Sequence, residues 1–203
     1  MNKPLTLYTN PMSRGRIVRW MLEELNATYD TVIVQYGPEM KGPEYLAINP
    51  MGKVPAIKHG DIVVTECAAI CAYLADAFPE AGLAPDLNDR GSYYRWLFFA
   101  AGPVEHAVTN KTLNVELTDR QQGMVGYGSL SRVQNALEHA LQQSSFVAGD
   151  KFTAADVYVG SHVYWALKYA RLESKPVFTD YVDRLGARKA NRRAEELDGP
   201  TDM

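Results

Sequence analysis

The segment that most constrains this chain runs from Asn49 to Cys71, with the sequence NPMGKVPAIKHGDIVVTECAAIC. The β-rich runs Val54–Lys58 and Asp61–Val64 are predicted to form an antiparallel hairpin, joined by a turn at His59–Gly60. Cys67–Ala77 then has the apolar spacing of a helix. A hairpin followed at once by a helix start is therefore expected.

Two details of this segment point to a ligand. Pro55 opens a strand, a position that a ladder tolerates, and the Val54–Pro55 bond is a candidate for the cis form. A cis bond would turn the backbone groups of Val54 away from the sheet, where an extended peptide could pair with them. Glu66 and the free amides at the following helix start would bind charged groups. A short peptide with its own carboxylate could bind both the backbone of Val54 and the helix start at Glu66.

The motif N-P-M-G-K-V-P-A, a hairpin and then T-E-C-A-A-I resembles the glutathione-binding half of the cytosolic, soluble glutathione S-transferases. The family pattern is N-P-x-G-x-V-P followed by E-S, so Cys67 stands where the family has serine. The backbone amide of Cys67 can still donate to a glutamyl carboxylate, whereas a thiol is a weaker donor than a hydroxyl. The resemblance, to the bacterial type with a serine-like site, extends from about Leu5 to Ala187.

Residues 1–78 have the predicted element order of an α/β, thioredoxin-like domain. Leu5–Thr9 is a strand, the apolar run between residues 17 and 22 has helical spacing, and Thr31–Gln35 is a second strand. A short helix starts at Pro43 and ends at Asn49. With the hairpin and its helix, the order is β-α-β-α-β-β-α, beginning with a βαβ crossover.

Residues 79–88 are predicted to be a linker, because they contain prolines and a glycine without periodicity. Residues 89–203 are predicted to form an all-helical domain, with helical patterns over residues 89–114, 118–143, 153–171 and 176–187. Gly102–Pro103 should kink the first of these helices. Thr153 and Asp156 have the spacing of a capping box.

Composition predicts an ordinary globular protein: 203 residues, of which 46% are hydrophobic, with 21 basic and 24 acidic residues. This balance predicts neither a nucleic-acid nor a membrane partner. Without a signal peptide or an apolar run of about 18 residues, a cytoplasmic protein is expected. The basic pairs between residues 188 and 193 are interpreted as a solvated helix face. Cys67 and Cys71 match no disulfide framework or metal site.

A bound thiolate needs a hydrogen-bond donor. Lowering a thiol pKa of about 8.5 by about 2 needs about 2.7 kcal/mol, and one hydroxyl at a helix N-terminus contributes roughly 1.5 to 3 kcal/mol. Ser13, Tyr8 and Thr9 compete for this catalytic role, in that order of preference. By resemblance, Ser13 has the spacing of the serine-type classes and Tyr8 matches the tyrosine-type classes, while Arg14 replaces the cysteine of the bacterial cysteine-type class. A plain helix N-cap is the alternative for Ser13.

The resemblance also implies a set of glutathione-binding residues: Lys41, Lys53, Val54, Pro55, Glu66 and Cys67. Glu66 would accept from the ammonium group of glutathione. Lys53 or Lys41 would pair with its glycyl carboxylate, although either lysine could equally be solvated. The electrophile pocket would be formed by the second domain facing the thiol, with candidates Met12, Trp96, Phe99 and His106. Most of the aromatic stripe around residue 96 is expected to be core or dimer packing instead.

The expected function is that of a homodimeric glutathione S-transferase, which conjugates the thiolate of glutathione to hydrophobic electrophiles in detoxification. Glutathione would be the co-substrate, and no metal is expected. Two alternatives remain open. One is a non-catalytic binding or scaffold protein with the same fold. The other is a glutathione-dependent thiol-disulfide or peroxide enzyme that uses Cys67.

Overall fold

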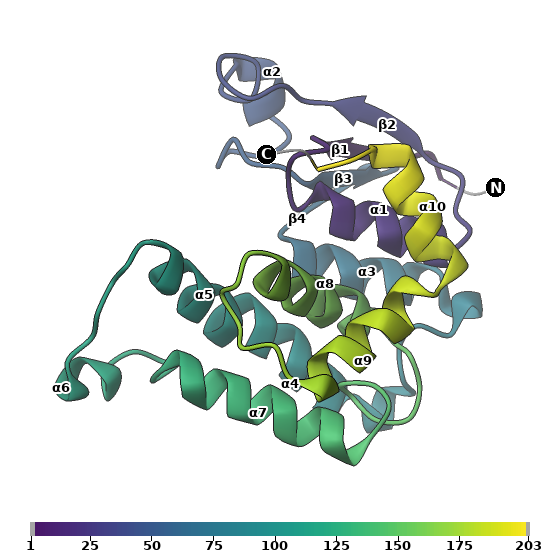
Figure 1. Ribbon diagram of the computed structural model, residues 1–203. Helices are drawn as coiled ribbons and strands as arrows, with labels where there is room; N and C mark the ends of the chain where they lie inside the picture. The colour runs from purple at the N-terminus through teal and green to yellow at the C-terminus, as the bar shows by residue number, and fades with distance from the viewer. Residues whose placement is uncertain (1–2, 202–203) are drawn as a thin grey trace. The chain divides into compact units, whose positions relative to one another are not determined.

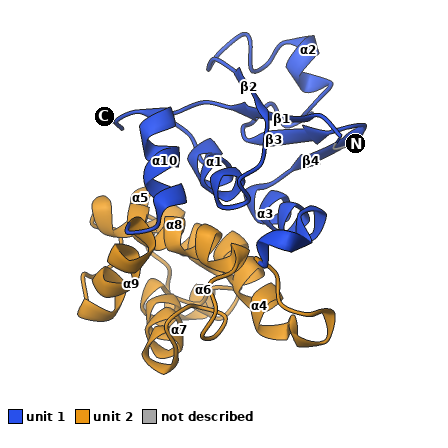
Figure 2. Ribbon diagram, turned by 90° about the vertical axis from the view of Figure 1, so that its right-hand side faces the viewer, with its two compact units in different colours: residues 1–82, 187–203 blue, residues 83–186 orange. Residues whose placement is uncertain are grey.

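The structure is a computed structural model that describes residues 3–201. The chain divides into two compact units, residues 1–82 with 187–203 and residues 83–186 (Figure 2). The sequence placed residues 89–203 together in one helical domain, whereas residues 187–203 lie with the first unit. In the part of the chain that the structure describes, no helix is long and apolar enough to cross a membrane.

The described part of the first unit contains a four-stranded sheet of order β2-β1-β3-β4 (Figure 1). Its strands are β1 Leu5–Thr9, β2 Asp30–Ile33, β3 Ala56–His59 and β4 Ile62–Thr65. β1 pairs in parallel with β2 and antiparallel with β3, and β3 pairs antiparallel with β4. The predicted thioredoxin-like order and the hairpin are confirmed, with strand ends shifted by one or two residues.

Helices α1, Gly15–Glu24, and α3, Cys67–Ala77, lie on one face of this sheet, and the short α2, Pro43–Leu46, lies on the other (Figure 1). The apolar residues of α1 between positions 17 and 22 are buried, as their spacing predicted. The bounds of α3 agree with the prediction from sequence.

A last helix, α10, Lys189–Asp198, packs along α1. The sequence predicted a solvated helix face for the basic pairs of this segment, but not that the helix docks on α1. Two ion pairs dock it: the Arg19 Nε lies 2.6 Å from the Asp198 Oδ1, and the Arg188 Nε lies 2.6 Å from the Glu24 Oε1. The charged sequence of α10 has the composition of a solvated surface. Its docking depends on partners far away in the sequence, which the local pattern does not identify.

The second unit is built from helices and turns. Its helical segments are η2 Leu87–Asp89, α4 Gly91–Phe99, η3 Ala100–Val104, α5 Glu105–Thr112, α6 Asp119–Gln122, α7 Leu130–Gln143, α8 Ala154–Lys168 and α9 Pro176–Gly186. The linker before it also contains the 3-10 turn η1, Pro79–Ala81. Pro103 lies in η3, a π-helical turn between α4 and α5, where the sequence predicted an interruption. The all-helical class of this part is confirmed.

The single helix predicted over residues 118–143 is wrong. α6 ends at Gln122 and α7 begins only at Leu130. Three glycines lie between them, and Gly128 adopts a φ of +68°, which does not continue a right-handed helix. The helical periodicity of α7 is real, but it does not extend across these glycines.

The start of α8 contains the predicted capping box of Thr153 and Asp156. The Asp156 carboxylate is completely buried and also accepts from the Val147 N–H at 2.8 Å and the Tyr181 hydroxyl at 2.9 Å. Burial raises the pKa of Asp156, and its hydrogen bonds oppose that rise. One carboxylate thus joins the helix start, the preceding loop and α9.

Replacing Asp156 by alanine should lower the free energy of unfolding by about 3 to 5 kcal/mol, because the Val147 N–H and Tyr181 hydroxyl would remain buried without an acceptor. Urea denaturation measures this loss. Tyr181→Phe is the control, because it removes one donor and should cost only about 1 kcal/mol. A loss below 1 kcal/mol in Asp156→Ala would contradict the structural role assigned to this carboxylate.

Candidate functional site

Three segments from different parts of the sequence meet at one end of the sheet. In the β1–β3 pairing Tyr8 lies opposite Ala56, so the carboxyl end of β1 lies beside the amino end of β3. In the β3–β4 pairing Ala56 lies opposite Thr65, so α3 also starts at this end. The loop with Ser13, the Val54–Pro55 bond and the Glu66 helix start therefore converge.

The Val54–Pro55 peptide bond is cis, as predicted. Val54 precedes the β3–β4 ladder, whose first pair is Ala56 with Thr65. Within residues 3–201, no backbone hydrogen bond uses the N–H or the carbonyl of Val54. Both groups are therefore open to pairing with an extended peptide.

The loop before Val54 is held in place by side chains. The Lys53 carbonyl accepts from the Tyr45 hydroxyl at 2.6 Å and from the Asn49 Nδ2 at 2.8 Å. Burial raises the pKa of Tyr45 to about 12, so its hydroxyl stays protonated and donates. The Lys41 Nζ donates to the Gly52 carbonyl at 2.7 Å, which holds its charge against this loop. Lys41 is thus positioned rather than merely solvated, whereas Lys53 has an exposed side chain.

Glu66 precedes α3 in a backbone conformation that side-chain-bearing residues rarely adopt, with φ +66° and ψ 118°. Such a conformation costs of order 1–3 kcal/mol and occurs most often at functional sites. The Glu66 side chain is exposed and caps no amide of α3. Its carboxylate is therefore displayed toward solvent at a helix N-terminus. The sequence predicted the position of this carboxylate but not its backbone strain.

The two cysteines lie inside the first unit. The Cys67 thiol donates to the Arg14 carbonyl at 3.6 Å, so it points toward the start of α1. Cys71 is completely buried, and burial raises the pKa of its thiol well above the usual value. A buried thiol that resists ionisation is a poor nucleophile. Cys71 is therefore unsuited to thiol-disulfide chemistry. Cys67, on which that alternative rests, is only 7% exposed, which limits the access of a disulfide partner to its sulfur.

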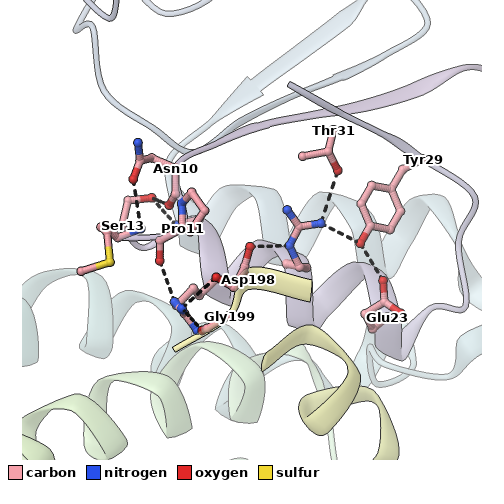
Figure 3. A network of polar contacts seen from close by, with 12 residues as sticks. Asn10, Pro11, Ser13, Glu23, Tyr29, Thr31, Asp198 and Gly199 are labelled. Atoms are coloured by element: carbon pink, nitrogen blue, oxygen red, sulfur yellow. Dashed lines mark hydrogen bonds and ion pairs between the residues drawn. The ribbon is translucent and has the colours of Figure 1, made fainter. Parts of the chain in front are cut away.

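Asn10 organises the loop between β1 and α1 (Figure 3). Its buried side chain donates to the Val34 carbonyl at 3.1 Å and accepts from the Met12 N–H at 3.0 Å. Its carbonyl accepts from the Ser13 N–H at 3.0 Å and from the Ser13 hydroxyl at 2.6 Å. The Ser13 Oγ in turn accepts from the Gly15 N–H at 2.9 Å. Ser13 thus lies just before α1, near the helix start as predicted, and its hydroxyl oxygen accepts from the first N–H of the helix; the N-cap position itself is Arg14.

Asn10 did not emerge from the sequence as a site residue. The available signal was its place before a proline at a strand end, where an asparagine side chain often bonds to nearby backbone groups. Arg16, which also contacts this loop, was likewise not predicted.

The other two hydroxyl candidates differ in position. Thr9 is completely buried, and its Oγ1 has no hydrogen-bond partner among the residues that the structure describes. A Cβ at Gly15 would lie 1.8 Å from that oxygen, so the start of α1 covers it. We therefore withdraw Thr9 as a thiolate donor. Tyr8 is half-buried, and its ring centroid lies 6.0 Å from that of Tyr45 on the α2 face.

The candidates for the electrophile pocket differ in exposure. Trp96 is 1% exposed and belongs to the core of the second unit, so we withdraw it from the pocket. Phe99 is half-buried, with its ring edge-on to Trp96 at 5.1 Å between centroids. His106 is exposed in the second unit, and Met12 is 43% exposed in the first. Across residues 3–201, no group of three or more metal-ligating side chains could hold an ion.

Comparisons with known proteins agree with this geometry. A family model described as the glutathione S-transferase N-terminal domain matches residues 3–76. Glutathione S-transferase F10 of Arabidopsis thaliana is 28% identical over 164 residues, covering 75% of this chain and 76% of the relative.

Solved structures extend the similarity to both units. A glutathione transferase from Methylococcus capsulatus str. Bath has a TM-score of 0.80 at 28% identity, covering 96% of this chain and 98% of the other. A glutathione transferase homologue from Sulfitobacter, with bound glutathione, has a TM-score of 0.77 at 25% identity, covering 96% and 98%. The chain belongs to the glutathione S-transferase family.

Proposed function

We propose that this protein is a glutathione S-transferase that conjugates the thiolate of glutathione to hydrophobic electrophiles. The observation that carries this proposal is the exposed, strained Glu66 at a helix start, at the same end of the sheet as the unpaired backbone of Val54. The similar Sulfitobacter structure contains bound glutathione, which supports glutathione as the co-substrate.

Each part of glutathione has a matching group. The Glu66 carboxylate accepts from the ammonium of the γ-glutamyl end, and the Cys67 N–H at the start of α3 donates to its carboxylate. The backbone of Val54 pairs with the cysteinyl residue in an extended arrangement. Lys41, held at Gly52, and the exposed Lys53 attract the glycyl carboxylate.

Ser13 supplies the hydroxyl that stabilises the thiolate in this proposal. Its proton now bonds to the Asn10 carbonyl, and rotation about the Cβ–Oγ bond would redirect it to a sulfur. The Gly15 N–H donates to the same oxygen, and a hydroxyl that accepts one hydrogen bond becomes a stronger donor of its own. The contact of the Ser13 hydroxyl with the Gly15 N–H is therefore compatible with catalysis.

Glutathione should raise the melting temperature, because a ligand bound only by the folded state stabilises it by about 2.7 kcal/mol at a hundredfold excess over its Kd. Glu66→Ala should lose most of that rise, because it deletes the acceptor for the ligand's ammonium group. Thermal unfolding with and without millimolar glutathione measures both effects. Glu80→Ala removes an exposed carboxylate in η1 and serves as the matched control.

An unmoved wild-type transition at millimolar glutathione would overturn the proposed function in favour of a scaffold protein. A full rise in Glu66→Ala, with binding intact, would instead remove Glu66 from the glutathione site and leave the function standing.

Ser13→Ala should leave glutathione affinity within a few fold but raise the pKa of the bound thiol. Turnover of an aryl halide at neutral pH should fall by about 10 to 1,000-fold, as expected for losing a charge-assisted bond of roughly 1.5 to 3 kcal/mol. Absorbance of the thiolate as a function of pH gives the pKa directly. Tyr8→Phe is the control and should change neither quantity. Loss of the thiolate in Tyr8→Phe but not in Ser13→Ala would assign the role to Tyr8.

We further propose a homodimer. Phe98 and Tyr94 on α4 are 73% and 40% exposed, and apolar side chains displayed together on one helix often mark an interface. Sedimentation equilibrium at micromolar concentration should give twice the chain mass of 22.6 kDa. Only the 22.6 kDa species at that concentration would contradict this proposal.

A further inference from the structure

The side chain of Arg16 connects the loop that carries Ser13 to the end of the last helix (Figure 3). Its Nε donates to the Pro11 carbonyl at 2.6 Å. Its Nη2 donates to the Asp198 carbonyl at 3.3 Å and to the Gly199 carbonyl. One guanidinium thus bonds to two backbone segments that are far apart in the sequence.

The C-terminal end of α10 is suited to hold this guanidinium. The last carbonyls of a helix have no intrahelical partner and carry partial negative charge, which favours a cation. The Asp198 side chain is itself anchored, with its Oδ1 2.6 Å from the Arg19 Nε and side-chain exposures of 1% and 6%. Burial lowers the pKa of Arg19, but the Asp198 charge and the hydrogen bonds to Asp198 and Tyr29 together raise it, so the guanidinium keeps its charge. Burial raises the pKa of Asp198, and the Arg19 charge and hydrogen bond oppose that rise. Arg19 also donates to the Tyr29 hydroxyl at 3.2 Å and to the Thr31 hydroxyl at 3.3 Å.

The Pro11 carbonyl is a point at which this loop needs support. Proline has no N–H, so the backbone of residue 11 can be held by hydrogen bonds only through its carbonyl. The Asn10 side chain fixes both neighbours of Pro11: it donates to the Val34 carbonyl, and it accepts from the Met12 N–H. The Arg16 bond holds the carbonyl of the Pro11–Met12 peptide group, whose N–H donates to the Asn10 side chain.

We infer that Arg16 is a positioning residue for the Ser13 hydroxyl, and that the end of α10 holds Arg16 in the required orientation. This inference rests on the proposed role of Ser13 as thiolate donor. A hydroxyl that must meet a sulfur atom is sensitive to small displacements, because a shift of about 1 Å can cost about 100-fold in rate. The C-terminal helix therefore contributes to the acid-base step without touching glutathione.

Arg16→Lys tests this inference while keeping the charge. A lysine ammonium lacks the planar fork with which Arg16 reaches all three carbonyls. The pKa of the bound glutathione thiol should rise by about 1, so turnover at neutral pH should fall up to about tenfold. The Kd for glutathione, measured by calorimetry, should stay within a few fold. Arg193→Ala is the control, because it removes only an exposed bond to Glu196 within α10. It should change neither the pKa of the bound thiol nor the Kd for glutathione.

A double variant separates positioning from a direct effect of the Arg16 charge on the sulfur. If Arg16 acts through Ser13, then Arg16→Lys in a Ser13→Ala background should raise the thiol pKa no further. A further rise of the same size in that background would overturn the inference. The inference would also be overturned if Ser13→Ala raised the thiol pKa but Arg16→Lys left it unchanged. The proposed function would still stand in that case.

Asp198→Asn provides a second route to the same answer. It keeps the α10 carbonyls but weakens the anchor at Arg19, so it should raise the thiol pKa in the same direction by a smaller amount. It decides the question if Arg16→Lys does not fold, and an unchanged thiol pKa would then overturn the inference. Failure of the wild-type protein to bind glutathione would instead be a failure of the proposed function.

Discussion

The buried side chain of Asn10 is the interaction on which the rest of the candidate site depends. It lies just after β1, donates to the Val34 carbonyl just beyond β2 and accepts from the Met12 N–H, while the backbone carbonyl of Asn10 accepts from Ser13. A buried amide that satisfies backbone groups on two sides leaves the chain one low-energy path. This places the start of α1 directly over Thr9, where only the glycine at position 15 fits without a shift.

The sheet then brings the remaining groups to the same place. Because β3 runs antiparallel to β1, the start of β3 meets the end of β1, and the hairpin returns the chain to that end at Thr65. Val54 offers its backbone there, and Glu66 offers a carboxylate at a helix start. The strained backbone of Glu66 opposes folding, and such strain occurs most often at functional sites, which is why we propose a binding role for Glu66.

The last helix extends this arrangement to a remote part of the chain. α10 carries a strongly polar sequence, yet its end is buried through the Arg19–Asp198 pair. Breaking a buried ion pair leaves an uncompensated charge, so the pair makes the docking of α10 specific. Arg16 uses the docked helix end to hold the Pro11 carbonyl, and so links the C-terminal residues to the loop of the site.

Local sequence signals determined much of this protein. The proline at position 55, the helix from Cys67 and the capping box of Asp156 were readable because each depends on neighbours within a few residues. The prediction of one helix across Gly123–Gly128 was wrong, because it relied on apolar periodicity and gave too little weight to the three glycines in this segment.

Only the tertiary structure decided which candidate side chains are accessible. Thr9 and Trp96 match the site by sequence position, but packing buries them. The roles of Asn10 and Arg16, the strain at Glu66 and the docking of α10 depend on contacts between distant segments. A local pattern predicts a helix or a turn, whereas burial and long-range hydrogen bonds are set by which surfaces meet when the chain folds.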